Sequence, residues 1–431
     1  MITGLLGFGI LIALCFFGFR VGFVTLIVGV VGFALQRGPE AAFAMAGQQI
    51  MEDAMNYNLS VIPLFILMGV FIFRADVSRD LYDAAYATFG RMRGGLALST
   101  VVACAGFSAV CGSSLATAAT MTKVAMPPMK KYGYRNSLAT GTIAAGGTLG
   151  IMIPPSVPLV IYGIVAEVDI GLLFMAGILP GLLLVGLFML AITIKVTLDP
   201  TAGPAGEPLG EEERRRAIRG VWPVLGLFVV VLGGIYGSIF TPTEASGIGA
   251  FGAAVIAIMR GHLRTLTEWK DALVDASKTT ASLFIVIFGA LVFAQFINLS
   301  GLPFDLLFMV DDMDLTPYQL VIVIAIIAVL MGMIFESIGI LLLLVPVFLP
   351  SLYASGVDMI WFGIVVVVVT ELGLITPPIG MNVFVVKSVA PSVRLSQIFR
   401  GVVPFIFAIL AALLLVFLVP GIATFLPAVL R

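Results

Sequence analysis

Apolar segments long enough to cross a lipid bilayer recur along the whole chain, and this pattern limits the fold more than any other feature. A membrane-spanning helix needs about 20 mostly apolar residues. Only 11% of the 431 residues are charged and 60% are hydrophobic, whereas soluble domains carry about 25% charged residues. Because backbone amides and carbonyls must be satisfied inside lipid, the sequence predicts an all-α polytopic membrane protein.

Ten segments are predicted to cross the membrane, and they are 2–19, 21–36, 59–73, 137–166, 171–196, 222–240, 243–259, 281–299, 358–388 and 399–426. Two further apolar segments, 96–131 and 316–354, contain GSS and FES at their centres. We expect both to be re-entrant hairpins, which enter and leave the membrane on one face. Three amphipathic segments are predicted to lie along the membrane interface, at 40–56, 76–90 and 264–278.

The basic residues test this topology, because Lys and Arg are retained on the cytoplasmic side of a membrane. With the predicted crossings, 20 of the 23 Lys and Arg residues fall on one face. Arg37 and Arg431 fall on the other face, and Lys123 lies inside the first hairpin. The prediction is therefore that the charged linker at 198–221 is cytoplasmic and that both termini face the outside.

Two Pro-Pro pairs interrupt apolar segments in matching ways, in GIMIPPSVPLVIYG at 150–163 and in GLITPPIGMNVFVV at 373–386. Proline inside a helix costs about 3 kcal/mol, since it removes a donor and clashes with the preceding turn. Pro154 follows the hairpin residue Ser113 by 41 positions, and Pro377 follows Ser337 by 40. The first half crosses the membrane an odd number of times, so the second half is predicted to be inserted upside down.

This inverted repeat is typical of secondary transporters, which place a site near the middle of the bilayer. We expect residues 1–95 and 222–315 to form scaffold helices with interface arms. Residues 96–197 and 316–431 are expected to hold the hairpins and the transport helices.

Interrupted helices expose backbone carbonyls, which attract cations, and half-helix N-termini, which attract anions. Hydroxyl and carbonyl oxygens are hard ligands suited to Na⁺, so two sodium sites are predicted, each where a hairpin tip meets a broken helix. The residues assigned to sodium are Ser113, Gly150, Ile153, Pro154, Ser337, Gly373, Thr376 and Gly380. A substrate carboxylate is expected between the tips, with Ser114, Ser156, Glu336, Pro377 and Asn382 as the candidate residues.

Two carboxylates, Glu336 and Glu371, are predicted to lie deep in the membrane. Such groups are rare there and commonly functional, but a structural acid at a helix N-terminus explains each equally well. Lys123 is expected to extend toward the cytoplasm. The chain has no G-x-x-x-x-G-K-[ST] motif, and His262 is its only histidine, so neither P-loop ATP hydrolysis nor an H-E-x-x-H zinc site is predicted. No nucleic-acid signal is present, and no enzyme activity is expected.

Several of these stretches resemble the large membrane subunit of TRAP transporters, a family within the ion-transporter superfamily. The resemblance rests on NLSVIPLFILMG at 58–69, AGFSAVCGSSLATAATMTKVAMPPMKKYGY at 105–134, TGTIAAGGTLGIMIPPSVPLVIYGI at 140–164, TPTEASGIGA at 241–250 and GLITPPIGMNVFVV at 373–386.

The resemblance implies an elevator mechanism in the inner membrane of a bacterium, driven by a sodium gradient. It implies an organic-acid substrate such as a C4-dicarboxylate or a sialic acid, delivered by a periplasmic binding protein. It also implies a small four-helix membrane subunit, expected as a separate chain. The alternatives are a sodium/dicarboxylate symporter that needs no binding protein, a channel, and a scaffold or receptor that transports nothing.

Overall fold

The computed structural model describes residues 2–207 and 209–430, and every regular element in that part of the chain is helical. Seven helices are long and apolar enough to cross a membrane, and five shorter apolar helices accompany them. The prediction of an all-α polytopic membrane protein is confirmed.

The first half of the chain begins with a set of helices that precede the first hairpin, and these are α1 (Ile2–Phe16), α2 (Val21–Arg37), α3 (Pro39–Ala54), the 3-10 turn η1 (Tyr57–Ser60), α4 (Val61–Arg74) and α5 (Val77–Phe89). The hairpin and the helices after it are α6 (Gly95–Cys111), α7 (Ser114–Lys131), α8 (Asn136–Thr148), the 3-10 turn η2 (Leu149–Ile151), α9 (Val157–Val165) and α10 (Ile170–Leu198).

The second half follows the same order. Its first helices are α11 (Glu211–Tyr236), α12 (Pro242–Met259), α13 (Leu266–Leu299) and α14 (Leu302–Asp312). The second hairpin and the helices after it are α15 (Pro317–Gly332), α16 (Ser337–Ala354), α17 (Met359–Ile375), α18 (Met381–Val389), α19 (Leu395–Leu418) and α20 (Gly421–Val429). Both predicted hairpins and both predicted Pro-Pro interruptions are present.

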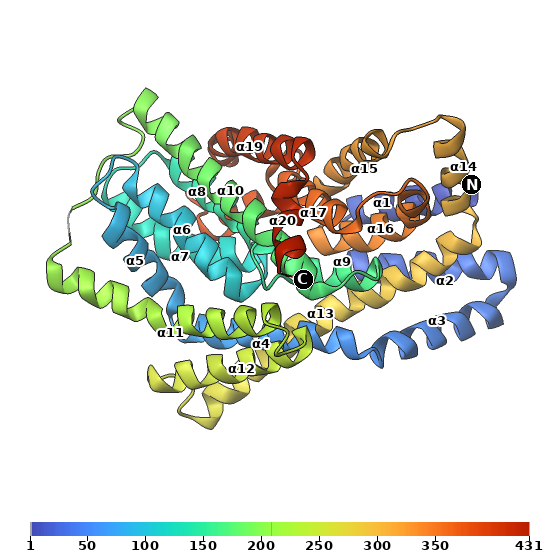
Figure 1. Ribbon diagram of the computed structural model, residues 1–431, viewed down its shortest axis with the longest axis horizontal. Helices are drawn as coiled ribbons and strands as arrows, with labels where there is room; N and C mark the ends of the chain where they lie inside the picture. The colour runs from blue at the N-terminus through green and yellow to red at the C-terminus, as the bar shows by residue number, and fades with distance from the viewer. Residues whose placement is uncertain (1, 208, 431) are drawn as a thin grey trace.

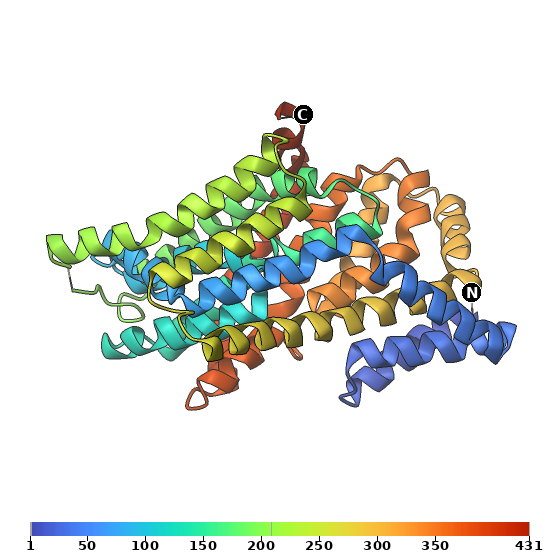
Figure 2. The same cartoon turned by 90° about the horizontal axis from the view of Figure 1, so that it is seen from below.

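In Figure 1, helices α4, α11, α12 and α13 lie along one long side of the molecule and α10, α15 and α19 along the opposite side, with the hairpin helices α6, α7 and α16 between them; Figure 2 shows the first of these sides. Helix α2 packs tightly on α13, because glycines on both helices let the two backbones approach closely. A Cβ on Gly29 would lie 2.8 Å from the Phe293 backbone nitrogen, and one on Gly289 would lie 2.2 Å from the Gly22 carbonyl oxygen. Close backbone approach of this kind is how helices associate in lipid, where apolar burial gives little driving force.

Three boundaries differ from the sequence prediction. The segments 264–278 and 281–299 were predicted as separate elements, but α13 runs through both, since no Gly or Pro interrupts the chain between Leu263 and Gly289. The linker after α10 ends at Gly210 instead of 221, because three glutamates start α11 and complement its N-terminal dipole. The predicted crossing 399–426 is divided at Pro420 into α19 and α20.

Ion pairs join elements that are distant in sequence at the ends of these helices. Arg260 at the end of α12 pairs with Asp80 of α5 and donates to the Gly220 carbonyl of α11. Arg135, just before α8, pairs with Asp199 at the end of α10. These contacts fix the ends of the helices that position the first hairpin.

Candidate functional site

Tip 1, formed by Gly112 and Ser113, is the turn between the two helices of the first hairpin. Gly112 has φ +61, a left-handed conformation that glycine adopts without a steric penalty. The Ser113 hydroxyl accepts a hydrogen bond from the Ala116 amide at 3.4 Å and so caps α7. The Thr117 hydroxyl donates to the Ser113 carbonyl at 2.8 Å. Tip 1 therefore forms the capped N-terminus of α7.

Break 1, residues 152–156, separates η2 from α9 and is in contact with tip 1. A Cβ on Gly150 would lie 3.1 Å from the Ser113 carbonyl oxygen, and one on Gly112 would lie 3.3 Å from the Pro155 carbonyl oxygen. The Ser156 hydroxyl donates to the Ile151 carbonyl at 2.6 Å. The Ser113 and Pro155 carbonyls thus lie at the contact between tip 1 and the segment that holds break 1.

Tip 2, residues 333–336, and break 2, residues 376–380, repeat this arrangement in the second half. Gly332 ends α15 and lies directly against α17, since a Cβ on Gly373 would be only 2.5 Å from the Gly332 Cα. The Thr376 hydroxyl donates to the Leu372 carbonyl at 2.5 Å. Because this bond uses the hydroxyl proton, the oxygen lone pairs remain available to a cation.

The two halves are joined through the helices that follow the breaks. Helix α9 packs against α16 of the second hairpin, and α18 packs against α7 and α8 of the first half. The Asn382 amide nitrogen donates to the Ala144 carbonyl at 3.1 Å, which connects residues 238 positions apart. The Asn382 side-chain oxygen is buried and has no hydrogen-bond partner among the described residues, so it is a free acceptor between the two breaks.

The peptide bond between the two prolines is cis in both breaks. The surroundings of the two breaks differ, however. Pro154 and Pro155 are buried, whereas Pro377 and Pro378 are exposed. The two halves therefore match in sequence order and local geometry but not in how deeply each break is covered.

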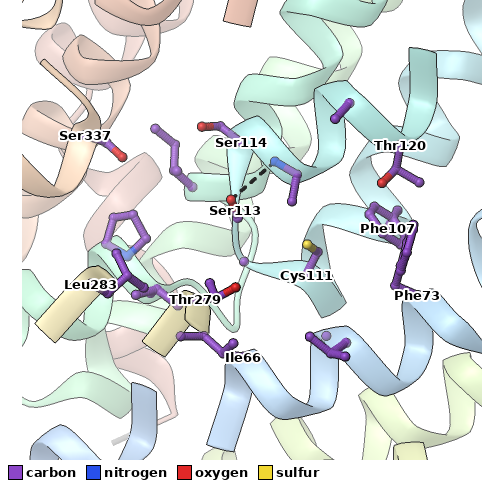
Figure 3. A pocket seen from close by; sticks show the side chains of 18 of the residues that line it. Ile66, Phe73, Phe107, Cys111, Ser113, Ser114, Thr120, Thr279, Leu283 and Ser337 are labelled. Atoms are coloured by element: carbon purple, nitrogen blue, oxygen red, sulfur yellow. Dashed lines mark hydrogen bonds between the residues drawn. The ribbon is translucent and has the colours of Figure 1, made fainter. Parts of the chain in front are cut away.

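A cavity of about 320 Å³ lies between the hairpin tips and helices α4 and α13, and we call it the tip cavity. Figure 3 shows Ser113 and Ser114 on one side of it, Ser337 on another, and Ile66 of α4 and Leu283 of α13 along its lower edge. Glu336, Thr120, Lys123 and Thr279 also line this cavity. Its walls are mostly apolar and carry a few polar groups, as ligand-binding cavities commonly do.

The predicted sodium residues divide into two groups in space. Ser113, Gly150, Ile153 and Pro154 lie at tip 1 and break 1, and Ser337, Gly373, Thr376 and Gly380 lie at tip 2 and break 2. Among the described residues, no group of three or more His, Cys, Asp or Glu could hold a metal ion. The available donors are neutral hydroxyl and carbonyl oxygens, which fit Na⁺, and the assignment stays a prediction.

The predicted substrate residues do not all reach the same space. Ser114 and Glu336 line the tip cavity. Ser156 and Asn382 are fully buried behind it, and Pro377 lies at break 2. The role of each residue in binding stays a prediction.

Glu371 lies in α17 two residues before Gly373 and is fully buried. Neither of its carboxylate oxygens has a hydrogen-bond partner among the described residues. The structure therefore does not give Glu371 the helix-capping role that the sequence left open.

A second, larger cavity of about 990 Å³ lies among α5, α7 and α11, and we call it the vestibule. Charged side chains of both signs line it, and Lys123 belongs to both this cavity and the tip cavity. Burial raises the pKa of the Asp83 carboxyl in its wall, and the nearby Arg79 offsets part of that shift. The vestibule thus adjoins the tip cavity at Lys123 and is lined by the charged residues near the ends of these helices.

The wall of the tip cavity that α4 and α13 form was not predicted from the sequence. Thr279 and Leu283 come from α13, at the point where the sequence predicted a boundary between an interface segment and a crossing. Ile66 and Phe73 come from α4. Their apolar side chains look like any lipid-facing residue in a sequence, so only the packing of distant helices reveals them.

The chain matches the family described as tripartite ATP-independent periplasmic transporter, DctM component, over residues 8–422. It is 36% identical to the C4-dicarboxylate TRAP transporter large permease protein DctM of Pseudomonas aeruginosa, over 88% of each chain. It is 30% identical to the sialic acid TRAP transporter large permease protein SiaM of Vibrio cholerae, over 96% of each chain.

Among solved structures, the YdaH transporter of Alcanivorax borkumensis superposes on this chain with a TM-score of 0.65. The two are 16% identical, and the match covers 89% of each chain. This similarity concerns the fold alone.

The contact between Gly332 and Gly373 gives a direct test of whether the second hairpin packs tightly on α17. Gly373→Ala should destabilise the protein by about 1–3 kcal/mol, because the new methyl group overlaps backbone and cannot be accommodated by a rotamer change. Thermal unfolding of the purified protein measures this. Gly186→Ala in α10 is the control, since nothing lies within 4 Å of its added Cβ. Equal stability of both variants would show that tip 2 does not pack tightly on α17.

Proposed function

The chain belongs to the DctM component family of the tripartite ATP-independent periplasmic (TRAP) transporters, and on this premise we propose that it imports an organic acid by sodium-coupled, elevator-type transport. The observation that carries the proposal is the tip cavity, in which the serines of both hairpin tips face one space. A C4-dicarboxylate, a sialic acid or a related carboxylate is the proposed substrate, in keeping with the named substrates of the relatives.

In this proposal Na⁺ is cargo and binds before the acid. One ion is held at tip 1 by oxygens around Ser113 and Gly150, and another at tip 2 by oxygens around Ser337 and Thr376. The Thr376 hydroxyl donates its proton to the Leu372 carbonyl, so its lone pairs can face a cation. The substrate carboxylate then lies between the tips, where the N-termini of α7 and α16 favour negative charge.

The elevator part of the proposal is supported by the difference between the two breaks. Break 1 is buried and the prolines of break 2 are exposed, as expected if the two halves exchange environments during transport. The tip cavity adjoins the vestibule among α5, α7 and α11, which lies by the predicted topology on the cytoplasmic side. We therefore assign this conformation to the inward-facing state.

The partners follow from the tripartite family. We propose that a small membrane subunit on a separate chain binds the scaffold and that a periplasmic binding protein delivers the acid. The excess of Lys and Arg on one predicted face supports an inner-membrane orientation with both termini in the periplasm and the linker after α10 in the cytoplasm.

Sodium coupling is tested by uptake of a radiolabelled acid into proteoliposomes that contain both membrane subunits, with the binding protein outside. An inward Na⁺ gradient should drive accumulation, and replacing Na⁺ with K⁺ should reduce uptake to background, because carbonyl and hydroxyl cages of fixed size discriminate between these ions. Equal uptake in K⁺ would contradict sodium coupling. Omitting the binding protein is the second arm, and full uptake of free acid without it would favour a symporter that needs no binding protein.

Thr376 tests the sodium site of the second half. Thr376→Val should raise the Na⁺ concentration for half-maximal uptake by about tenfold, as expected for losing one oxygen ligand worth about 1.4 kcal/mol. Thr193→Val is the matched control, because the Thr193 hydroxyl is exposed and bonds the carbonyl four residues earlier in the same way. The assignment of Thr376 would be wrong if the Na⁺ dependence of the two variants were the same.

A further inference from the structure

Lys123 lies at the junction of the tip cavity and the vestibule and lines both. It belongs to α7, the helix that begins at tip 1. Among the described residues that line the tip cavity, Lys123 is the only basic one and Glu336 the only acidic one. These two side chains therefore set the charge that the protein presents to a ligand in this cavity.

The Lys123 ammonium group has no ion-pair partner in the described part of the chain. The side chain is exposed, and it forms no hydrogen bond or ion pair with any residue that the structure describes. A lysine within a membrane-embedded hairpin is costly, and unpaired charges there commonly mark substrate pathways. Lys131, near the end of the same helix, lines the vestibule only, so the two lysines differ in whether they reach the tip cavity.

The geometry of α7 directs Lys123 toward the tip. Nine residues separate it from Ser114, which corresponds to about 13 Å along the helix axis. Helical side chains lean toward the N-terminus of their helix, and Lys123 lines the tip cavity as well as the vestibule. Its position is therefore not only on the cytoplasmic side toward which the sequence predicted it to extend. An acid in the tip cavity would therefore have the N-terminal amides of α7 at one end and an ammonium group at the other.

The charge balance of the cavity favours this lysine as the partner of an anionic ligand. Without Lys123, the described lining would have no cationic side chain, and an acid there would be left with the partial positive charge of the helix N-termini. We infer that Lys123 is the anion-binding residue of the tip cavity: it contacts an acidic group of the substrate there and during release into the vestibule, and it gives acids their preference over uncharged analogues. This inference rests on the proposed function.

The test is calorimetric binding to the purified full chain in Na⁺, with an acid that the wild-type complex takes up from a panel of succinate, malate and N-acetylneuraminate. Each acid is compared with the analogue in which amides replace its carboxylates. Lys123→Gln should raise the Kd of the acid about tenfold, the cost of one charge-assisted contact, and leave amide binding unchanged. Lys123→Arg should keep the Kd of the acid within threefold. Lys131→Gln is the matched control and should behave as wild type.

Three results would overturn the inference. The first is a Kd of the acid for Lys123→Gln within twofold of wild type, and the second is an equal loss of affinity for the acid and for its amide analogue. The third is a loss of acid affinity in Lys131→Gln as large as that in Lys123→Gln. Each of these leaves the proposed function standing, provided that Na⁺-driven uptake by the wild type persists. If the wild type neither binds nor takes up any organic acid, the proposed function fails and this inference fails with it. Elution of Lys123→Gln as a single species on size exclusion confirms that the variant is folded.

Discussion

The structure depends on one constraint, which is that a helix interrupted inside a membrane must have its freed backbone groups satisfied by protein. At break 1 the Ser156 hydroxyl donates to the Ile151 carbonyl and accepts from the Leu159 amide, and tip 1 packs against the remaining carbonyls. At break 2 the Thr376 hydroxyl, which precedes the prolines, donates instead to the Leu372 carbonyl in the last turn of α17. The groups that make each interruption tolerable also leave oxygen lone pairs at the tips, and these are the proposed cation ligands.

Close backbone contact joins each hairpin to its own broken helix, and the helices after the breaks join the two halves. A Cβ on Gly150 would lie 3.1 Å from Ser113, a tight contact, and one on Gly373 would overlap the Gly332 Cα at 2.5 Å. Asn382 then ties α18 to α8 across the halves. The two hairpins and the two broken helices are thereby packed together. The tip cavity lies where this group of helices meets α4 and α13.

Local sequence features predicted the hairpins and interruptions well, because Pro-Pro pairs and small-residue tips act within a few residues. The predicted hairpin 96–131 corresponds to α6 and α7. Amphipathic patterning was less reliable, since α13 continues through a predicted boundary where nothing breaks the helix. The scaffold wall at Leu283 and the bond from Asn382 to Ala144 depend on the packing of distant helices, which spacing along one chain does not encode. The sodium and substrate assignments remain predictions.

The most direct test of the account is the position of bound Na⁺, measured by comparing density maps of the protein in Na⁺ and in choline. The account predicts two sodium peaks, one among the oxygens of Ser113 and break 1 and one among those of Ser337, Gly373 and Thr376. Sodium bound elsewhere, or maps that do not differ at the tips and breaks, would contradict it.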